Sequence, residues 1–343
     1  MKKALIVSAV VLCAAALGWG GTVIFQKVYD RKCPNFSSSF ELYVHPGMES
    51  AEVLDSILAS GKVISPRSLR RTVSGLTEVK VGHYTLDSKS SSMYAARMLS
   101  HGWQTPVLLT LSGAIRSPKV LARKIGAQML VDSADVASFI YCEDSLLRYG
   151  MDTTRLFCMV IPDSYDIKWT ASVRDIFDRF KKEHDAWWTR ERRIAAEMQD
   201  LTPEEVSILA SIVDGETRYV PEQPTIAGVY LNRLRCGMKL QADPTVAYCF
   251  GYTQNRILRR HLEVDSPYNT YMYAGLPPGP ISCPPKSCLE AVLHPEDHSY
   301  LYFCADSQLN GKHVFAVSYK DHLDNARAFQ KALTKRLKEK QNS

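Results

Sequence analysis

One acidic side chain stands out as a candidate for chemistry. Glu216 lies near the end of the stretch Ser207–Tyr219, which reads SILASIVDGETRY. An α-helix advances about 100° per residue, which places Glu216 almost in line with Leu209 on the apolar side. Asp214 would face nearly the opposite way, toward water. A carboxylate in apolar surroundings usually takes up a proton. Glu216 is therefore predicted to be a neutral acid that can protonate a leaving oxygen.

Helical phase alone leaves a structural role for Glu216 open. In that role it is a buried Glu with satisfied hydrogen bonds or a helix-end carboxylate near solvent. Three loop-forming segments accompany it: Leu240–Asp243, Pro267–Tyr271 and Gly275–Pro280. Their amides, hydroxyls and aromatic faces suit the hydroxyls and C–H faces of sugars. The same residue types also make ordinary turns.

Other chemistries find no support. The sequence contains no GxGxxG, Walker, GxSxG or HExxH motif. His294 and His298 are four residues apart, but Pro295 between them disfavours a helix that would align them on a metal. We therefore expect no metal and no cofactor. The nine cysteines show no CxxC spacing; Cys283 and Cys288 are close enough to pair, although buried free thiols are the plainer interpretation.

Length and composition indicate a folded protein of about two domains. The chain has 343 residues, of which 45% are hydrophobic and 23% charged. Its net charge of +6 is mild, and the basic residues are spread along the chain. We therefore expect no nucleic-acid partner.

The N-terminus predicts a membrane anchor over residues 1–32. An uncharged run from Ala4 to Gln26 follows Lys2 and Lys3, and it is long enough to cross a bilayer as a helix. A cleaved signal peptide is the alternative, with Ala14–Ala16 as the cleavage site, but apolar residues continue past that site. We expect the anchor to be uncleaved and the remaining chain to lie on one side of the membrane.

The elements that position Glu216 indicate an α+β protein. Residues 36–165 read as a small α/β region, whose strands and helices are expected at 40–44, 50–60, 65–73, 82–86, 90–99, 105–111 and 117–130. Residues 166–343 begin with one long charged helix over 172–198. Thr202, Pro203 and Glu205 then form the signature of a helix start, and that helix carries Glu216. Helices at 225–236 and 243–248 follow, with Asp243 as the N-cap of the second. A hairpin around Asn310-Gly311, joining strands at 300–305 and 313–317, and a last helix near Asp321 complete the chain.

Five segments together resemble the endolytic murein transglycosylase, or YceG-like, family. They are ILASIVDGET, GVYLNRLRCGMKLQADPTVAY, SPYNTYMYAGLPPGPI, LHPEDHSYLYFCAD and HVFAVSYKDH, in order from about Leu209 to His322. Upstream, GHYTL and the helix after it are similar to the family's LysM-like subdomain. IPDSY resembles its Phe-Pro-Asp-Thr-Tyr segment.

The resemblance implies site residues. The family's usual run is Glu-Lys-Glu-Thr, and its second Glu, the catalytic acid and base, falls on Glu216. Asp214 and Gly215 replace the first Glu and the Lys. Five further residues match the family's substrate-cleft motifs: Gln241, Asp243, Tyr268, Asn269 and Thr270.

The resemblance also implies an activity. It is a lyase reaction that cleaves the MurNAc-β-1,4-GlcNAc bond within nascent peptidoglycan glycan strands and leaves 1,6-anhydroMurNAc ends. The catalytic domain would lie outside the cytoplasmic membrane, and peptidoglycan synthases are suggested as partners, although no motif marks their binding. Two alternatives stay open: a hydrolase of the same bond, with Asp243 or Asp214 activating water, and a noncatalytic peptidoglycan-binding scaffold built on the LysM-like region.

Overall fold

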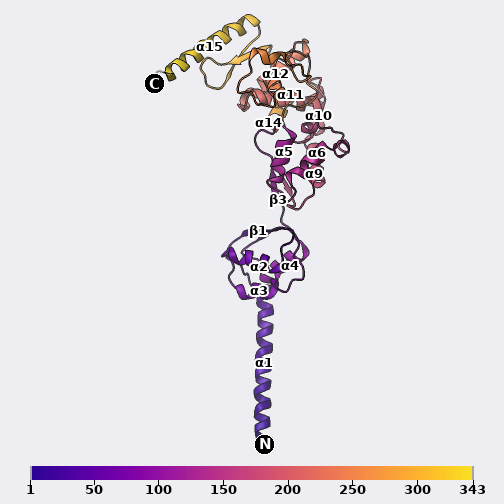
Figure 1. The fold of residues 1–343 in the computed structure, drawn as a ribbon, viewed down its shortest axis with the longest axis vertical. Helices are drawn as coiled ribbons and strands as arrows, with labels where there is room; N and C mark the ends of the chain where they lie inside the picture. Colours follow the sequence, from indigo (N-terminus) through magenta and orange to yellow (C-terminus); the bar gives the residue numbers. More distant parts are fainter. Residues whose placement is uncertain (1, 342–343) are drawn as a thin grey trace. The chain divides into compact units, whose positions relative to one another are not determined.

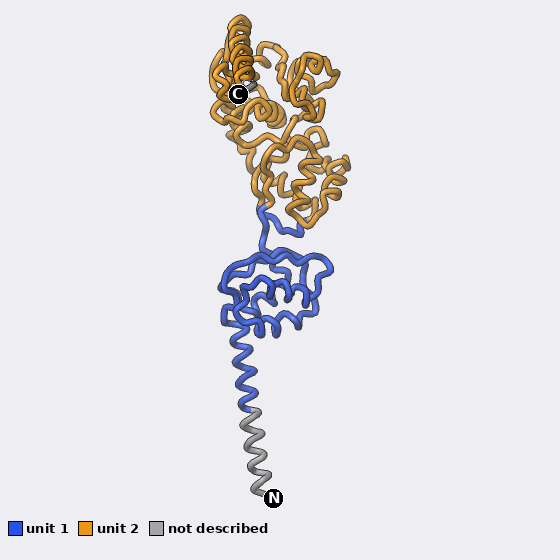
Figure 2. Tube along the Cα trace, turned by 60° about the vertical axis from the view of Figure 1, so that its left-hand side comes forward, with its two compact units in different colours: residues 1–108, 166–171 blue, residues 109–165, 172–343 orange. Residues whose placement is uncertain are grey.

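The chain forms two compact units in a computed structural model that describes residues 2–341, with side chains for residues 17–339. The first unit comprises residues 1–108 and 166–171, and the second comprises 109–165 and 172–343 (Figure 2). The expected division at residue 165 therefore differs from these units, because residues 109–165 pack with the C-terminal part. The α+β class expected from the sequence is confirmed by helices interspersed with small two-stranded sheets.

The first unit contains an antiparallel sheet and several packed helices (Figure 1). Strands β1 (Phe40–Val44) and β2 (Gly82–Leu86) pair with Phe40 opposite Leu86. Helices α2 (Ser50–Ala59), α3 (Pro66–Val73) and α4 (Ser92–His101) supply the rest of a buried core. Gly102 ends α4 in a left-handed conformation, φ 67°, as glycine readily does. The likeness of this unit to a LysM domain stays a prediction.

Helix α1 (Lys2–Lys32) also belongs to the first unit. Among the described residues, we find no helix with the length and apolar character that crossing a membrane requires. The expected anchor is thus not supported by the described part of the chain. Most of the apolar run from Ala4 to Gln26 lies outside the described side chains.

The second unit begins with a helical segment that the sequence patterns only partly predict. Its helices here are α5 (Pro118–Gly126), α6 (Ser133–Tyr141), α7 (Glu143–Leu147) and α8 (Leu156–Met159). They lie between two paired strands, β3 (Val107–Thr110) and β4 (Ser164–Ile167), each of which has residues in both units. The helix expected to reach Leu130 ends at Gly126. A Cβ atom there would lie 2.6 Å from the backbone nitrogen of Ser133, so this end of α5 packs directly on the start of α6.

The long charged helix expected over residues 172–198 is wrong as a single element. It is two helices, α9 (Val173–Trp187) and α10 (Arg190–Glu197). The backbone of Trp188 leaves the helical region at ψ 69°, and the Thr189 hydroxyl then caps α10 by accepting a hydrogen bond from the Arg192 amide. Charge and helix propensity continue across this point, so periodicity alone did not reveal the break.

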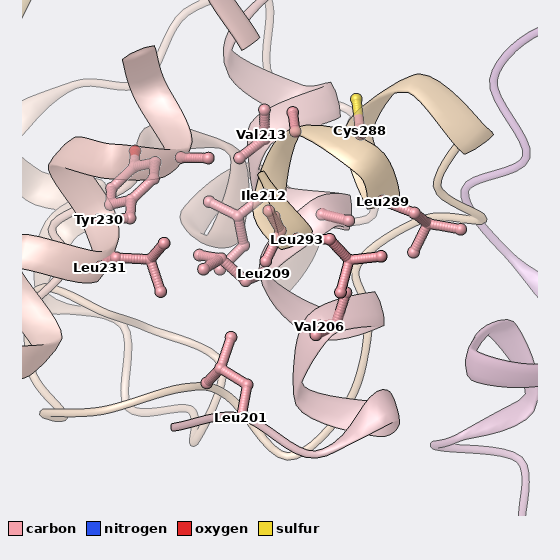
Figure 3. Packing of buried hydrophobic residues seen from close by; sticks show 14 of the residues in the cluster. Leu201, Val206, Leu209, Ile212, Val213, Tyr230, Leu231, Cys288, Leu289 and Leu293 are labelled. Atoms are coloured by element: carbon pink, nitrogen blue, oxygen red, sulfur yellow. The ribbon is translucent and has the colours of Figure 1, made fainter. Parts of the chain in front are cut away.

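The remaining helices enclose the core of the second unit. They are α11 (Pro203–Glu216), α12 (Gln223–Arg235), α13 (Asp243–Cys249), α14 (Lys286–Leu293) and α15 (Tyr319–Gln341), with short 3₁₀ turns η1 (Val220–Glu222) and η2 (Arg259–Glu263). Thr202 and Glu205 form the expected capping box of α11. Figure 3 shows Leu209, Ile212 and Val213 packed beside Tyr230 and Leu293. Strands β5 (Tyr302–Ala305) and β6 (His313–Ala316) form the expected hairpin.

All eight cysteines with described side chains are free thiols. Cys283 and Cys288, which are close enough in sequence to pair, are both buried and do not form a disulfide. Cys288 packs in the core, and the Cys283 thiol hydrogen-bonds the carbonyl of Val160. These two cysteines therefore act as small core side chains.

Candidate active site

Glu216 is the last residue of α11, and a tyrosine holds its carboxyl group. The Tyr230 hydroxyl donates a hydrogen bond to Glu216 Oε1 over 2.6 Å, and Tyr230 itself is 1% exposed. Glu216 as a whole residue keeps partial exposure because it lines a cavity, while protein atoms surround its carboxyl group. With Oε1 engaged, Oε2 is the oxygen available for a transferable proton.

The surroundings of Glu216 favour its protonated form. The pKa of Glu216 is raised from 4.5 to about 7: burial is the main cause, and the nearby charge of Asp243 acts in the same direction. The Tyr230 hydrogen bond and the charge of Arg233 act in the opposite direction on this pKa. Since the balance lies near neutral pH, Glu216 can both give and take a proton there, as a general acid–base residue must.

The cavity beside Glu216 has a volume of about 440 Å³. Its walls come from α11, α12, α13 and the loop before it, the segment that follows η2, the β5–β6 hairpin and α15. The polar and aromatic lining residues include Glu216, Tyr230, Arg233, Gln241, Asp243, Tyr271, Tyr302, Phe303, His313, Tyr319 and His322. Aromatic faces and hydrogen-bonding groups therefore surround one buried acid, which suits a carbohydrate.

Arg233 ties the walls of the cavity together. Its guanidinium donates from Nε to the carbonyl of Leu301 over 2.6 Å and from Nη1 to the carbonyl of Leu240. These bonds join α12 to the hairpin and to the loop before α13. The guanidinium also lies 5.5 Å from the centre of the Tyr302 ring. Arg233 is thus both a structural clamp and the cation nearest to the acidic groups in the lining.

The structure brings Gln241 and Asp243 together with Glu216 along this cavity. Gln241 has a positive φ of 50°, and its amide hydrogen-bonds the carbonyl of Thr270. Asp243 was expected as the N-cap of its helix, but it is the first helical residue and Ala242 is the cap. Its carboxylate instead accepts a 2.7 Å hydrogen bond from the Tyr271 hydroxyl. This bond fixes Asp243 at the edge of the cavity.

Tyr268, Asn269 and Thr270 do not line this cavity. Asn269 is fully buried and donates its side-chain amide to the carbonyls of Leu262 and Val264. The buried Thr270 hydroxyl accepts from the Ala242 amide. The Tyr268 ring packs against that of Tyr248 at 4.5 Å between centroids, tilted by 39°. In this structure, these three residues hold the loop that presents Gln241, Asp243 and Tyr271.

Asp214 is not exposed to water, contrary to the prediction from helical phase. It is half-buried, accepts a hydrogen bond from Ser282 at 3.3 Å, and lines a separate cavity of about 260 Å³. Burial raises the pKa of Asp214, although Ser282 and nearby arginines lower it. The reason is that segments far away in the sequence cover this face of α11: Ser282 contacts the carboxylate, and Gly113 and Pro162 line the same cavity.

Gly215 allows α13 to approach the end of α11. A Cβ atom at this position would lie 2.5 Å from Cβ of Pro244. Because Pro244 follows Asp243 directly, the missing side chain at residue 215 helps to set where Asp243 sits. This contact gives a physical reason for glycine at residue 215 in this chain.

Several lining residues were not predicted from the sequence, notably Tyr230, Arg233, Tyr271, His313 and His322. Tyr230 and Arg233 are three residues apart on α12 and so share a face, a spacing that could have signalled them. The contributions of the hairpin and α15 had no comparable local signal, because they reach the cavity only through the tertiary fold.

Other features do not compete with this site. A cavity of about 740 Å³ lies around Thr202, Leu234 and Pro277, and Glu216 is not among the residues that line it. His298 bonds the carbonyl of Thr225, and His294 is exposed. The described side chains contain no group of three or more metal-ligating residues.

The fold and the site together define an α+β protein with a polar and aromatic cavity. The cavity holds a buried carboxyl group whose pKa lies near neutral pH. Residues 42–328 match the YceG-like family, and the chain belongs to that family. A crystal structure of a YceG-like protein from Listeria monocytogenes is similar, with a TM-score of 0.57 and 27% identity. The likeness covers 84% of this chain and 98% of that one.

Two curated relatives carry the name endolytic murein transglycosylase. The Bacillus subtilis protein is 46% identical over 114 residues, which are 33% of this chain and 31% of that protein. The Streptococcus pneumoniae protein is 26% identical over 361 residues, covering 93% of this chain and 64% of that protein. The matches thus span less than two thirds of the length of these relatives.

Proposed function

We propose that this protein is a lytic transglycosylase that cleaves the MurNAc-β-1,4-GlcNAc bond within peptidoglycan glycan strands. The observation that carries the proposal is Glu216, whose buried carboxyl group has a pKa of about 7 and lines a cavity of polar and aromatic side chains. Membership of the YceG-like family and the names of the two relatives support the same activity.

In the proposed reaction, Glu216 donates its proton to the departing GlcNAc O4 while the C1–O4 bond breaks. Positive charge develops at MurNAc C1. The MurNAc C6 hydroxyl then closes on C1 and gives up its proton, which leaves a 1,6-anhydro end. Glu216, now a carboxylate, can accept that proton. An intramolecular hydroxyl has a high effective concentration, so a second carboxylate is not needed to activate water.

A hydrolase of the same bond is the second candidate, because Asp243 lies in the same cavity and affects the pKa of Glu216. In that reaction the second carboxylate would activate a water molecule. The two reactions differ in product mass, since hydrolysis adds one water to the new MurNAc end and anhydro formation does not.

The test is digestion of purified glycan strands with the wild-type chain and Glu216→Gln, followed by mass spectrometry. We expect anhydro ends from the wild type and a loss of about 10³-fold or more in the variant, since Gln cannot transfer a proton. Asp243→Asn, which keeps the shape of the second carboxyl group, separates the two reactions. Products heavier by one water, lost in Asp243→Asn, would establish the hydrolase. Binding without cleavage by the wild type would establish a noncatalytic scaffold.

A further inference from the structure

We propose that a second cavity, beside Asp214, binds the stem peptide of the glycan strand, with Arg218 and Gln223 as its anchors. The stem is the short peptide that MurNAc carries. The inference rests on the proposed cleavage, from which it takes the substrate, and it adds a binding site to that reaction. We call this second cavity the stem cavity, and the one beside Glu216 the cleavage cavity.

The stem cavity offers charged and amide groups rather than aromatic rings. Its volume is about 260 Å³, and its polar lining residues are Asp214, Arg218, Gln223, Cys283 and Ser287. The rest of the described lining consists of glycine, alanine, valine and proline. The cleavage cavity, by contrast, has several tyrosine rings in its lining. The stem cavity is therefore suited to a peptide, whereas the aromatic faces of the cleavage cavity suit sugar rings.

Arg218 supplies the positive charge of the stem cavity. It lies two residues after the end of α11 and is exposed. Within the described part of the chain, its guanidinium makes no hydrogen bond and no salt bridge. Burial raises the pKa of Asp214, and the charge of Arg218 acts against this rise, so the two groups are neighbours without being paired. Because the fork of a guanidinium matches a carboxylate, Arg218 is available for a carboxyl group of the stem.

Gln223 holds a buried carboxamide without partners. It is the first residue of α12, lines the stem cavity and is 3% exposed. Its Oε1 atom has no hydrogen-bond partner among the described residues, and its Nε2 atom makes no hydrogen bond there either. A buried polar group normally has a partner, because leaving it unpaired is costly. A carboxamide matches a peptide group, which has one N–H donor and one C=O acceptor. A peptide in the stem cavity would thus supply what Gln223 lacks.

The stem cavity and the cleavage cavity flank the same end of α11. Asp214 and Glu216 are two residues apart, so their side chains leave the helix in directions about 200° apart. A helix with its side chains is about 10–12 Å across. An extended peptide of about four residues spans up to about 14 Å. A stem on the MurNAc unit beside Glu216 is therefore long enough to reach the stem cavity.

A basic surface leads from the stem cavity toward the cleavage cavity. Arg218 lines the stem cavity, and Tyr219 after it is 41% exposed. The ammonium group of Lys312 lies 5.0 Å from the centre of the Tyr219 ring. The next residue, His313, lines the cleavage cavity. Arg218 and Lys312 therefore place two cations on this surface, which favours a stem with ionised carboxyl groups.

The experiment measures kcat/KM of the full chain on two substrates. The first is glycan strands that keep their stems, and the second is the same strands after an amidase has removed the stems. The readout is the ratio of the two values. The wild type should prefer stem-bearing strands by about tenfold or more, because binding energy from a remote part of the substrate speeds the reaction.

Three variants are compared by this ratio. Arg218→Gln should lower the ratio by about tenfold, because it removes a charge-assisted pair with the stem. Gln223→Leu removes the carboxamide and should lower the ratio by about three- to fivefold. The matched control, Arg190→Gln, changes an exposed arginine outside both cavities and should keep the wild-type ratio.

A wild type with no preference for stem-bearing strands, or an Arg218→Gln chain that keeps the wild-type ratio, would overturn the inference. A wild type that cleaves neither substrate would refute the proposed cleavage, and binding then decides about the stem cavity. Glu216→Gln is titrated with stem-bearing and bare glycan fragments by calorimetry, with and without Arg218→Gln. Tighter binding of stem-bearing fragments that Arg218→Gln abolishes would support the stem cavity, and equal binding of both fragments would overturn it.

Discussion

Replacing Tyr230 with Phe tests the account of Glu216 most directly. The substitution removes one hydroxyl group from a side chain that is 1% exposed and keeps the ring that packs in the core. It deletes the 2.6 Å hydrogen bond to Glu216 Oε1. The fold should therefore be retained, while the carboxylate of Glu216 loses a donor that stabilises its charged form.

The expected shift follows from the strength of that bond. A hydrogen bond to a charged group contributes about 1.5–3 kcal/mol, and one pKa unit corresponds to about 1.4 kcal/mol. The Tyr230 bond lowers the pKa of Glu216 from what burial alone would give, so removing it should raise the pKa from about 7 by one to two units. Because cleavage needs the protonated acid, the alkaline limb of the activity profile should move to higher pH by the same amount.

The assay is the pH dependence of kcat/KM for glycan cleavage by the wild type and Tyr230→Phe. Tyr252→Phe is the matched control, since its hydroxyl donates a 2.8 Å hydrogen bond to the carbonyl of Ile281 rather than to Glu216. The control should leave the alkaline limb in place. An alkaline limb that stays fixed or moves to lower pH in Tyr230→Phe would refute the assignment of this limb to Glu216.

Two further predictions concern stability. Glu216→Gln should stabilise the protein at alkaline pH. The pKa of Glu216 is about 7 in the folded state, raised mainly by burial, against 4.5 for the free side chain. The free energy of unfolding of the wild type therefore falls by up to about 3 kcal/mol as pH rises through this window. Urea unfolding should give the wild type and the variant equal stability at pH 4 and show a more stable variant at pH 8. The same stability difference at both pH values would contradict the raised pKa. Gly215→Ala should destabilise the protein by about 1–3 kcal/mol, because the new Cβ atom would meet Pro244 at 2.5 Å. The check is thermal unfolding of Gly215→Ala compared with Gly75→Ala, a control whose new Cβ atom would meet nothing within 4 Å. A Gly215→Ala chain as stable as this control would show that α13 is free to move away.

Helix α11 contributes both to the hydrophobic core of the second unit and to the candidate site. Leu209, Ile212 and Val213 are fully buried, and Glu216 follows them at the end of the helix. Helix C-termini carry partial negative charge, so this end also disfavours a carboxylate. The packing that stabilises the second unit therefore also keeps the acid protonated near neutral pH.

Local patterns in the sequence determined much of the fold. The capping box at Thr202 and Glu205, the turn at Asn310-Gly311 and the alternation in Phe40–Val44 each depend on neighbouring residues, and each element is present. The break between α9 and α10 was missed because two non-helical residues, Trp188 and Thr189, leave the charge pattern unchanged. Helical phase correctly placed Glu216 beside the apolar residues of α11.

Only the tertiary structure decided which side chains surround Glu216. Helical phase predicted that Asp214 faces water, but segments far away in the sequence, among them the one that carries Ser282, bury it in part. Tyr230, Phe303 and His313 meet at one cavity from α12, β5 and β6, and no local pattern records such a meeting. The sequence alone thus singled out Glu216 as a carboxyl group on the apolar side of its helix, since the period of one helix is a local property. Its partners depend on contacts between residues far apart in the chain, and only the packed fold establishes those.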